Sequence, residues 1–219
     1  DRKQLMSGTI DRVDICENGT DVYVRIIDYK TGKKDFNIVK TYYGIDIQLM
    51  VYMEAAMKLV AKMRPGKNVI PAGVFYYNIS DPIVSATTES ADEIEDKIKG
   101  ELRLKGMVNS DKDIAEKMDN TEGTSLNIPV SRKADGGFDS RRSKVMNTEQ
   151  FNMLGRFVDV RAVDTADRIA GGDIRRSPYK DGQFSSCDRC PYGAVCGFSV
   201  DLPGCNYRKL KKFDDEVLW

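Results

Sequence analysis

Two aspartates and a lysine in the first thirty residues have the types and the spacing for metal-assisted chemistry. Asp28 and Lys30 end the β-branched segment 21–30, and Asp11 lies in a second β-rich segment, 7–15. Carboxylates bind hard cations such as Mg²⁺, and a nearby lysine can orient an attacking water or offset developing charge. This combination suits hydrolysis of a phosphodiester. The alternative is a simple strand-end pair on a solvated face, because the D-x-K spacing is common by chance.

A β-hairpin is expected to bring these residues together. The segments 7–15 and 21–30 are separated by Asn18 and Gly19, and an Asn-Gly pair is a strong signal for a two-residue hairpin loop. The sequence therefore predicts two antiparallel strands at the start of the chain.

The register of this hairpin decides which acid faces Asp28. With Asn18 and Gly19 as the loop, Asp11 lies opposite Ile26 and shares the strand face of Asp28, since side chains alternate between the two faces. Asp11 then lies diagonally from Asp28, at roughly 7–8 Å. A loop one residue longer would place Asp14 on this face instead.

The rest of the chain mixes helices and strands, which predicts an α/β or α+β fold. A buried helix is expected at 45–63, where Gln48 and Tyr52 are four residues apart and so share one face. The other predicted elements are a strand at 73–80, a helix at 91–106 with a Ser90–Glu93 capping box, a short helix capped by Ser110, a turn-rich stretch at 120–147 with a hairpin tip at 135–137, and a helix from Thr148, its cap, to Ala170.

Two pairs of adjacent tyrosines, at 42–43 and 76–77, are candidates for stacking on single-stranded bases. Packing in the core or on a strand is the more common role for such residues.

Composition excludes several kinds of active site. No histidine occurs in the 219 residues, so Ser-His, Cys-His and His-ligated zinc sites are impossible within this chain, and no Walker loop is present. Basic and acidic residues balance at 34 each, so an anionic partner must be held locally. No apolar stretch is long enough to span a bilayer and no signal peptide is visible, so we expect a cytoplasmic protein without a membrane partner. The chain starts without methionine, and we expect it to be part of a longer protein.

Cysteines gather near the C-terminal end. Cys187, Cys190 and Cys196 form a tight cluster, Cys205 follows, and Cys16 lies far away in the hairpin. Four soft ligands suit zinc or an iron-sulfur cluster, and free thiols are the third possibility. Disulfides are less expected because nothing indicates secretion.

Four segments in this order, GTIDRVD, the Asn-Gly hairpin, IIDYKTG and GIDIQLMVY, resemble the RecB-type nuclease domain of the PD-(D/E)xK superfamily. The resemblance implies a restriction-endonuclease-like α/β core, with a mixed central sheet flanked by helices. It also implies these roles: Asp11, Asp28 and the main-chain carbonyl of Tyr29 bind Mg²⁺ or Mn²⁺, Lys30 is the catalytic lysine, and Gln48 and Tyr52 position the scissile strand next to Gly8, which matches the first motif.

The same family usually supplies a further acidic or histidine ligand from a helix upstream of the first motif. Only seven residues precede Gly8, so we expect the nuclease core, 1–186, to be truncated at its N-terminal side.

The tail, residues 187–219, resembles the C-terminal end of the AddB family of bacterial helicase-nuclease subunits through CDRCPYGAVCGF and the following YRKL. In that family three such cysteines and a fourth, upstream of the nuclease core, hold a [4Fe-4S] cluster. The resemblance implies that Cys187, Cys190 and Cys196 are cluster ligands. The fourth cysteine has no clear counterpart, so we expect the cluster to be complete only in the longer protein.

The leading hypothesis is a metal-dependent DNA exonuclease domain within a helicase-nuclease that processes double-strand breaks for recombinational repair. The resemblance implies a single DNA strand fed by a helicase and a partner subunit of the AddA type. One alternative is a stand-alone RecB-like exonuclease of the CRISPR adaptation type. The other is a non-catalytic module that binds DNA or a partner.

Overall fold

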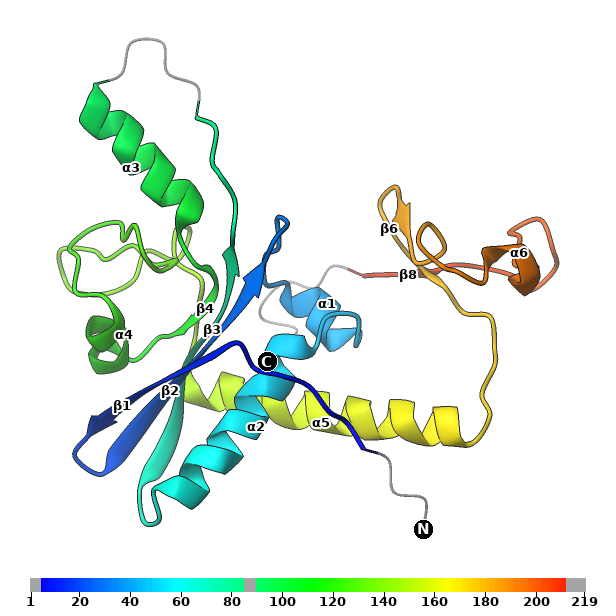
Figure 1. Ribbon diagram of the computed structural model, residues 1–219, viewed down its shortest axis with the longest axis horizontal. Helices are drawn as coiled ribbons and strands as arrows, with labels where there is room; N and C mark the ends of the chain where they lie inside the picture. Colours follow the sequence, from blue (N-terminus) through cyan, green and yellow to red (C-terminus); the bar gives the residue numbers. More distant parts are fainter. Residues whose placement is uncertain (1–4, 85–89, 212–219) are drawn as a thin grey trace.

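A mixed five-stranded sheet forms the centre of the computed structural model, which describes residues 5–84 and 90–211 (Figure 1). The strand order is β1-β2-β3-β4-β5, and a separate three-stranded sheet of order β7-β6-β8 forms in the tail. The strands are β1 Arg12–Asn18, β2 Asp21–Lys30, β3 Asn68–Asn78, β4 Lys105–Asn109, β5 Val145–Met146, β6 Tyr179–Asp181, β7 Phe184–Ser185 and β8 Arg208–Lys209. The predicted mixed α/β architecture is therefore confirmed.

Helices pack on both faces of the central sheet. The helices are α1 Ile38–Tyr42, α2 Gln48–Met63, α3 Ala91–Leu102, α4 Lys112–Met118, α5 Thr148–Ala170 and α6 Gly193–Cys196. Helices α2 and α5 share one hydrophobic cluster with alternate residues of β2, whereas α4 contributes to the clusters of the opposite face. Across the described ranges, no helix combines the length and the apolar character that a membrane span needs.

The hairpin register differs from the predicted one by two residues. Asn18 pairs with Asp21, so Gly19, at a φ of 59°, and Thr20 form the loop in place of Asn18 and Gly19. Glycine adopts this positive φ without steric cost, which explains its place at the first loop position. Because the shift is an even number of residues, the strand faces stay as predicted. Asp11 moves from the diagonal position to the position level with Asp28 when the register is continued by one residue.

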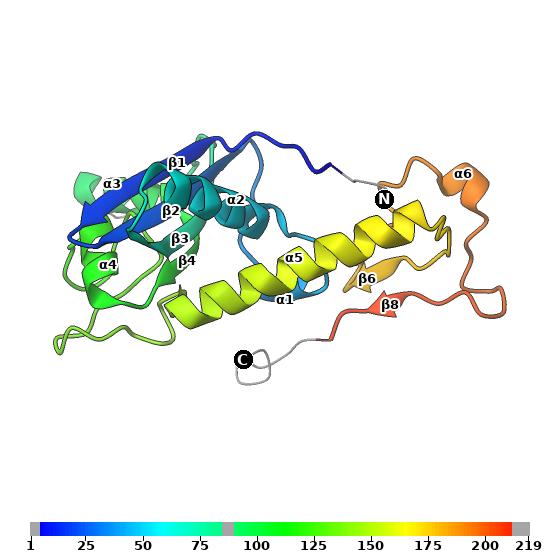
Figure 2. The same ribbon diagram turned by 90° about the horizontal axis from the view of Figure 1, so that it is seen from below.

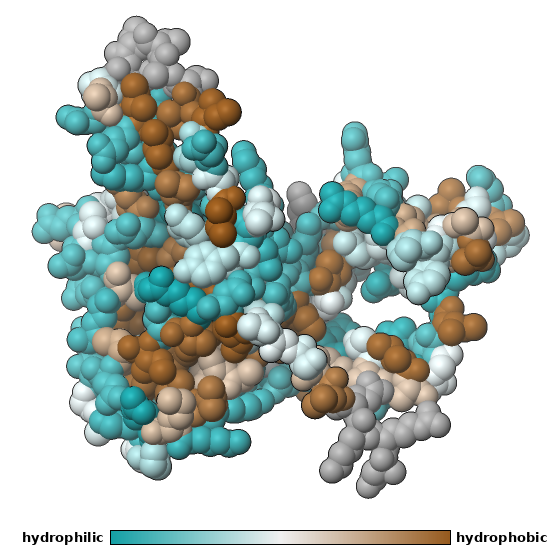
Figure 3. Space-filling model, viewed as in Figure 1, coloured by the Kyte–Doolittle hydropathy of each residue, from teal (hydrophilic) through white to brown (hydrophobic). Residues whose placement is uncertain are grey.

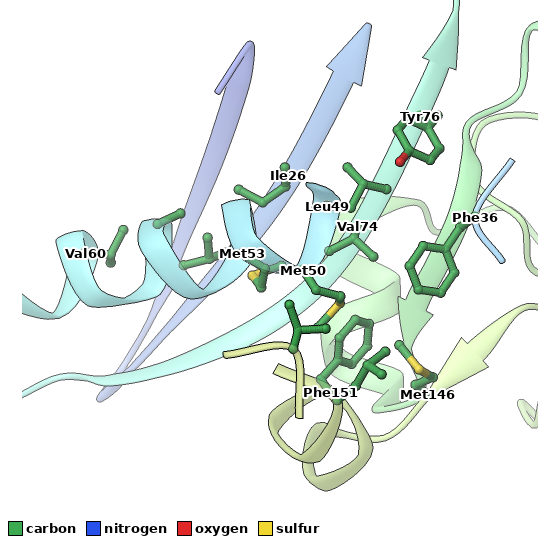
Figure 4. Packing of buried hydrophobic residues seen from close by; sticks show 14 of the residues in the cluster. Ile26, Phe36, Leu49, Met50, Met53, Val60, Val74, Tyr76, Met146 and Phe151 are labelled. Atoms are coloured by element: carbon green, nitrogen blue, oxygen red, sulfur yellow. The ribbon is translucent and has the colours of Figure 1, made fainter. Parts of the chain in front are cut away.

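Strand β2 is buried on both sides along most of its length, and its even-numbered residues face α2. Ile26 packs with Leu49 and Met50 of α2, with Val74 of β3 and with Phe151 of α5 in a single cluster (Figure 4). Close packing of this kind fixes side chains in single positions. The C-terminal end of β2 and the first turn of α2 are therefore held by a common core.

Several element ends differ from the sequence predictions because local caps compete. Helix α2 begins at Gln48, because residues 44–46 form a turn that follows α1. Asp111 caps α4 in place of Ser110, and Asn147 caps α5 in place of Thr148; both accept main-chain N–H groups of the first turn. The Ser90–Glu93 capping box is confirmed, but α3 ends at Leu102.

The predicted helix at 91–106 ends early because a strand follows it. Strand β4 starts at Lys105, and its Gly106 lies so close to β3 that an added Cβ would be 1.9 Å from the carbonyl oxygen of Val74. Only glycine fits there. The short strand β5 was not predicted from the sequence, since two residues carry no periodicity.

The tail stands apart from the central sheet. Helix α5 runs out of the core and leads to the tail strands (Figure 2), and the space-filling view shows the tail as a lobe with open space beside it (Figure 3). The small sheet starts at Tyr179, and an ion pair of 3.2 Å joins Lys40 of α1 to Asp181 of β6. The division at residue 187 remains a prediction, and the last predicted tail residues, 212–219, lie outside the described residues.

Candidate active site

Four predicted site residues form one hydrogen-bonded network where β2 ends and α2 begins. The Nζ of Lys30 donates to Gln48 Oε1 at 3.1 Å and forms an ion pair with Asp28 Oδ2. The Nε2 of Gln48 donates to Asp28 Oδ1 at 3.1 Å and contacts the Tyr52 hydroxyl at 3.0 Å. We name this set of four residues, Asp28, Lys30, Gln48 and Tyr52, the catalytic network.

Asp28 is the buried member of the catalytic network. Only 2% of it is exposed, and its Oδ2 receives no aligned hydrogen bond from the described residues; Lys30 contacts that oxygen through charge alone. A buried carboxylate oxygen without a donor is costly unless a cation compensates it. Asp28 therefore has an oxygen available for a bound metal ion.

Asp11 lies across the hairpin from Asp28 and is exposed. Its Oδ2 accepts a hydrogen bond of 2.9 Å from the main-chain N–H of Tyr29, which fixes the carboxylate beside the end of β2. Two carboxylates with main-chain carbonyl groups nearby form a hard oxygen donor set, which suits Mg²⁺ or Mn²⁺. In residues 5–84 and 90–211 no cluster of three or more Asp, Glu, Cys or His side chains is positioned to hold a metal.

Asp14, the other acid considered for this site, points to the opposite face of the hairpin. It accepts hydrogen bonds from the guanidinium groups of Arg12, at 2.8 Å, and Arg25, at 2.9 Å. Burial raises the pKa of Asp14, but the two arginines outweigh this effect and lower it overall. Asp14 therefore belongs to a structural ion pair and not to the catalytic network.

A second acid, Asp46, lies close to the catalytic network and was not singled out from the sequence. Its Oδ1 accepts a 2.9 Å hydrogen bond from the Tyr76 hydroxyl, and its Oδ2 pairs with Lys34 Nζ at 2.6 Å. The Tyr76 ring lies between two ammonium groups, 5.6 Å from Lys30 and 5.4 Å from Lys34. The one available signal was an acid two residues before Gln48 in an otherwise apolar stretch.

Tyr76 reports the electrostatics of this region. Burial raises the pKa of its hydroxyl far above the usual range, and the negative charges of Asp46 and Asp28 raise it further. The hydroxyl thus stays protonated and donates to Asp46. Tyr76 is 1% exposed, so this tyrosine packs in the core and is not open to base stacking.

A groove of about 760 Å³ borders the catalytic network on the α2 side, and Gln48, Tyr52 and Glu54 contribute to its lining. Gly8 lies against the Tyr52 ring, where an added Cβ would be 3.4 Å from Cε1. Burial raises the pKa of Glu54, and the nearby Asp159 adds to the shift. The groove gives a ligand access to the amide and hydroxyl of the network.

The predicted cluster ligands are not assembled into a metal site within the described part of the tail. Cys187 and Cys196 are half-buried, Cys190 is exposed, and Cys205 is buried; all are free thiols, as is the exposed Cys16. Cys187 and Cys190 lie in one turn, in which the Cys190 N–H donates to the Cys187 carbonyl at 3.1 Å. The role of Cys187, Cys190 and Cys196 as cluster ligands therefore remains a prediction.

Comparison with known protein families assigns the chain to a class of nuclease. The model of the PD-(D/E)XK nuclease superfamily matches residues 4–197. The chain therefore belongs to the PD-(D/E)XK nuclease superfamily, as the motifs indicated.

Several bacterial relatives share most of this chain, and each is named as the B-type subunit of an ATP-dependent helicase/deoxyribonuclease. The one from Thermoanaerobacter sp. (strain X514) is 37% identical over 214 residues, 97% of this chain and 18% of the relative. The one from Clostridium acetobutylicum is 37% identical over 98% of this chain and 19% of its own length. The one from Caldanaerobacter subterraneus subsp. tengcongensis is 39% identical over 97% of this chain and 18% of its own length. The chain thus spans about a fifth of the length of these relatives.

Proposed function

We propose that this chain hydrolyses phosphodiester bonds of DNA in a reaction that depends on Mg²⁺ or Mn²⁺, and that it acts as an exonuclease domain. The observation that carries the proposal is the catalytic network, in which a buried carboxylate, a lysine, a glutamine and a tyrosine contact one another. The match to the nuclease superfamily supports the type of chemistry.

In this proposal Asp11, Asp28 and the main-chain carbonyl of Tyr29 hold the metal. The free Oδ2 of Asp28 and the position of Asp11 level with it support this assignment. The bound ion would polarise the phosphate and lower the pKa of the attacking water. Asp28 also keeps Lys30 charged and in place, because the two form an ion pair.

Lys30 has the role of orienting the attacking water or of offsetting the charge that develops on the phosphate. Gln48 holds the lysine through its Oε1 and the carboxylate through its Nε2, so that a single amide fixes both groups. Tyr52 completes the network and, with Gln48, lines the groove through which the scissile strand would approach. Prior positioning of this kind lowers the barrier because little reorganisation is left for the reaction.

The wider setting is also a proposal. The names of the relatives support a place within a helicase-nuclease that processes double-strand breaks, with a single DNA strand as substrate and an AddA-type subunit as partner. Such a protein would act in the cytoplasm. In the longer protein, Cys187, Cys190 and Cys196 would hold three corners of a [4Fe-4S] cluster whose fourth ligand comes from outside this chain.

The test is cleavage of end-labelled single-stranded DNA with Mg²⁺, in this chain and in the helicase-nuclease of which we propose it to be a part. Lys30→Ala should slow cleavage by about 100-fold or more, the scale of a lost electrostatic or acid-base group. Lys67→Ala, at the opposite end of the sheet, is the matched control, because the Lys67 ammonium donates to the Gly19 carbonyl of the hairpin loop and lies away from the catalytic network.

Cleavage that is equal in Lys30→Ala and in the wild type would contradict the proposed role of the lysine. A lack of cleavage by every form, in the longer protein as well, would favour the alternative of a non-catalytic module.

A further inference from the structure

A second groove, of about 530 Å³, lies on the face of the central sheet opposite the catalytic network. Tyr29 and Tyr77, from adjacent strands, line it together with Arg12, Arg25 and Lys99. We name it the tyrosine groove. Neither the family assignment nor the catalytic network gives this groove a role.

The two tyrosines offer aromatic surface within the groove. Tyr29 is 38% exposed and Tyr77 is half-buried. Their ring centroids are 5.8 Å apart and the rings are inclined by 83°, so the pair is edge-to-face. In this arrangement one ring does not cover the whole face of the other. Base stacking on such rings is the sequence-tolerant way in which proteins bind single-stranded nucleic acid.

The charge of the groove is positive. Arg12 and Arg25 share a single carboxylate, that of Asp14, and hydrogen bonds to Asp14 and to the Tyr29 hydroxyl raise the pKa of Arg12. Two cations against one anion leave one net positive charge beside the aromatic rings. The Arg12 side chain is 49% exposed, so it can meet a phosphate of a bound strand.

The position of the groove connects it to the catalytic network. Side chains alternate along a strand, so Tyr29 points to the groove while its neighbours Asp28 and Lys30 point to the network. In the same way Arg12 directly follows Asp11 in the sequence. Both proposed metal-binding carboxylates therefore have groove residues as covalent neighbours, and a strand that crosses the end of β2 reaches both faces.

We propose that the tyrosine groove binds nucleotides of the same single DNA strand whose scissile phosphate lies at the catalytic network. This inference rests on the proposed nuclease function and adds a binding subsite to it. Tyr29 and Tyr77 stack on bases, and Arg12 contacts a phosphate. The groove thereby holds the substrate strand next to the reacting phosphate without reading its sequence.

The experiment measures binding of a fluorescein-labelled oligothymidylate to the 219-residue chain by fluorescence anisotropy, in EDTA and over a range of salt concentrations. Tyr29→Leu keeps the main-chain carbonyl and should weaken binding about tenfold without changing the salt dependence. Arg12→Gln should reduce the slope of log K against log salt by about 0.7, the value for one lost phosphate contact, whereas Arg12→Lys should keep the slope.

Arg64→Gln is the matched control. Arg64 is exposed to a similar degree, 40%, and is also paired with a carboxylate, Glu17, but it lies at the opposite end of the hairpin. Its replacement should change neither affinity nor slope. Wild-type affinity and slope in both Tyr29→Leu and Arg12→Gln would overturn the inference, as would the absence of binding by the wild type.

The two proposals fail separately. Because EDTA removes the metal, binding in this assay does not depend on the chemistry. If Asp28→Asn abolishes cleavage while the groove variants bind like the wild type, the groove inference is wrong and the nuclease proposal stands. If the groove variants bind weakly but no form cleaves DNA, the groove inference stands and the nuclease proposal is wrong.

Discussion

The two ends of this molecule hold their functional side chains in different ways. At the end of β2, the catalytic network is assembled by hydrogen bonds and is supported by a close-packed core that includes Ile26 and Phe151. In the tail, the cysteines lie in turns and in the four-residue helix α6, and Cys190 is exposed. The chain alone therefore builds the first site, whereas the second site has ligands without a shared scaffold.

The difference shows what a core contributes to a site. Buried side chains fix the backbone of β2 and α2, so the polar groups at their ends have few alternative positions. A small sheet of two- and three-residue strands buries little apolar surface and gains stability from a metal or a disulfide more readily than from packing. We therefore expect the tail to depend on its cluster.

Removal of a cluster ligand should have the strongest consequence. In the longer protein, purified without oxygen, Cys190→Ser should abolish the iron-sulfur charge-transfer absorbance, because one cluster ligand is removed. Cys16→Ser, which changes an exposed cysteine in β1, should leave the absorbance unchanged. Colourless wild-type protein that contains stoichiometric zinc would contradict the iron-sulfur prediction.

A core substitution tests the other side of the comparison. Phe151 is 1% exposed, and Phe151→Ala should lower the free energy of unfolding by about 3–5 kcal/mol, measured by denaturant titration. Val195 in the tail is 82% exposed, and Val195→Ala should change it by less than about 0.5 kcal/mol. Equal losses would show that the tail has a core of its own.

The glutamine of the catalytic network provides a smaller effect without unfolding. Gln48→Ala removes the amide that holds both Asp28 and Lys30, and cleavage should fall by about 10- to 100-fold, the range for a lost supporting hydrogen bond. Gln183→Ala in the tail, which changes an exposed glutamine, is the control and should retain full activity. An unimpaired Gln48→Ala variant would mean that packing alone positions the lysine.

A dependence of stability on pH at Asp119 should be the weakest of these effects. Burial raises the pKa of this carboxylate, but hydrogen bonds from Thr121, Ser125 and Asn127 outweigh it and lower the pKa from 3.8 to about 2. The ionised form is therefore favoured in the folded state. The resulting contribution, of about 2 kcal/mol, is fully present above pH 4 and is lost as the pH falls toward 2.

Thermal unfolding of wild type and Asp119→Asn between about pH 2 and pH 7 measures this contribution. Their difference in stability should shrink as the pH falls through that window. Asp188→Asn is the comparison in the tail: hydrogen bonds from the main chain and hydroxyl of Ser185 lower the pKa of Asp188, but this carboxylate is exposed. A difference between Asp119→Asn and the wild type that stays constant with pH would contradict the assignment.

Much of the catalytic end could be predicted because its signals are local. Alternation along β2 placed Asp28 and Lys30 on one face, and the spacing of Gln48 and Tyr52 placed both on one side of α2, as the 3.0 Å contact confirms. The choice of Asp11 survived a wrong hairpin loop, because an error of two residues preserves the faces of the strands.

Other features depend on contacts that the sequence does not display. Asp46 joins the region through Tyr76, thirty residues away, and no periodicity links the two. The tyrosine groove requires the alignment of β2 with β3, which a parallel pair acquires only through a long connection. The tail was predicted by resemblance alone, since short strands and turns carry no pattern of their own.

Calorimetric titration of the chain with Mn²⁺ tests most directly whether the end of β2 is a metal-binding active site. We expect one binding site whose heat disappears in Asp28→Asn and persists in Asp14→Asn, because Asp14 pairs with arginines on the opposite face. No heat from the wild type, or the same heat from Asp28→Asn, would contradict the assignment of the metal to this end of the strand.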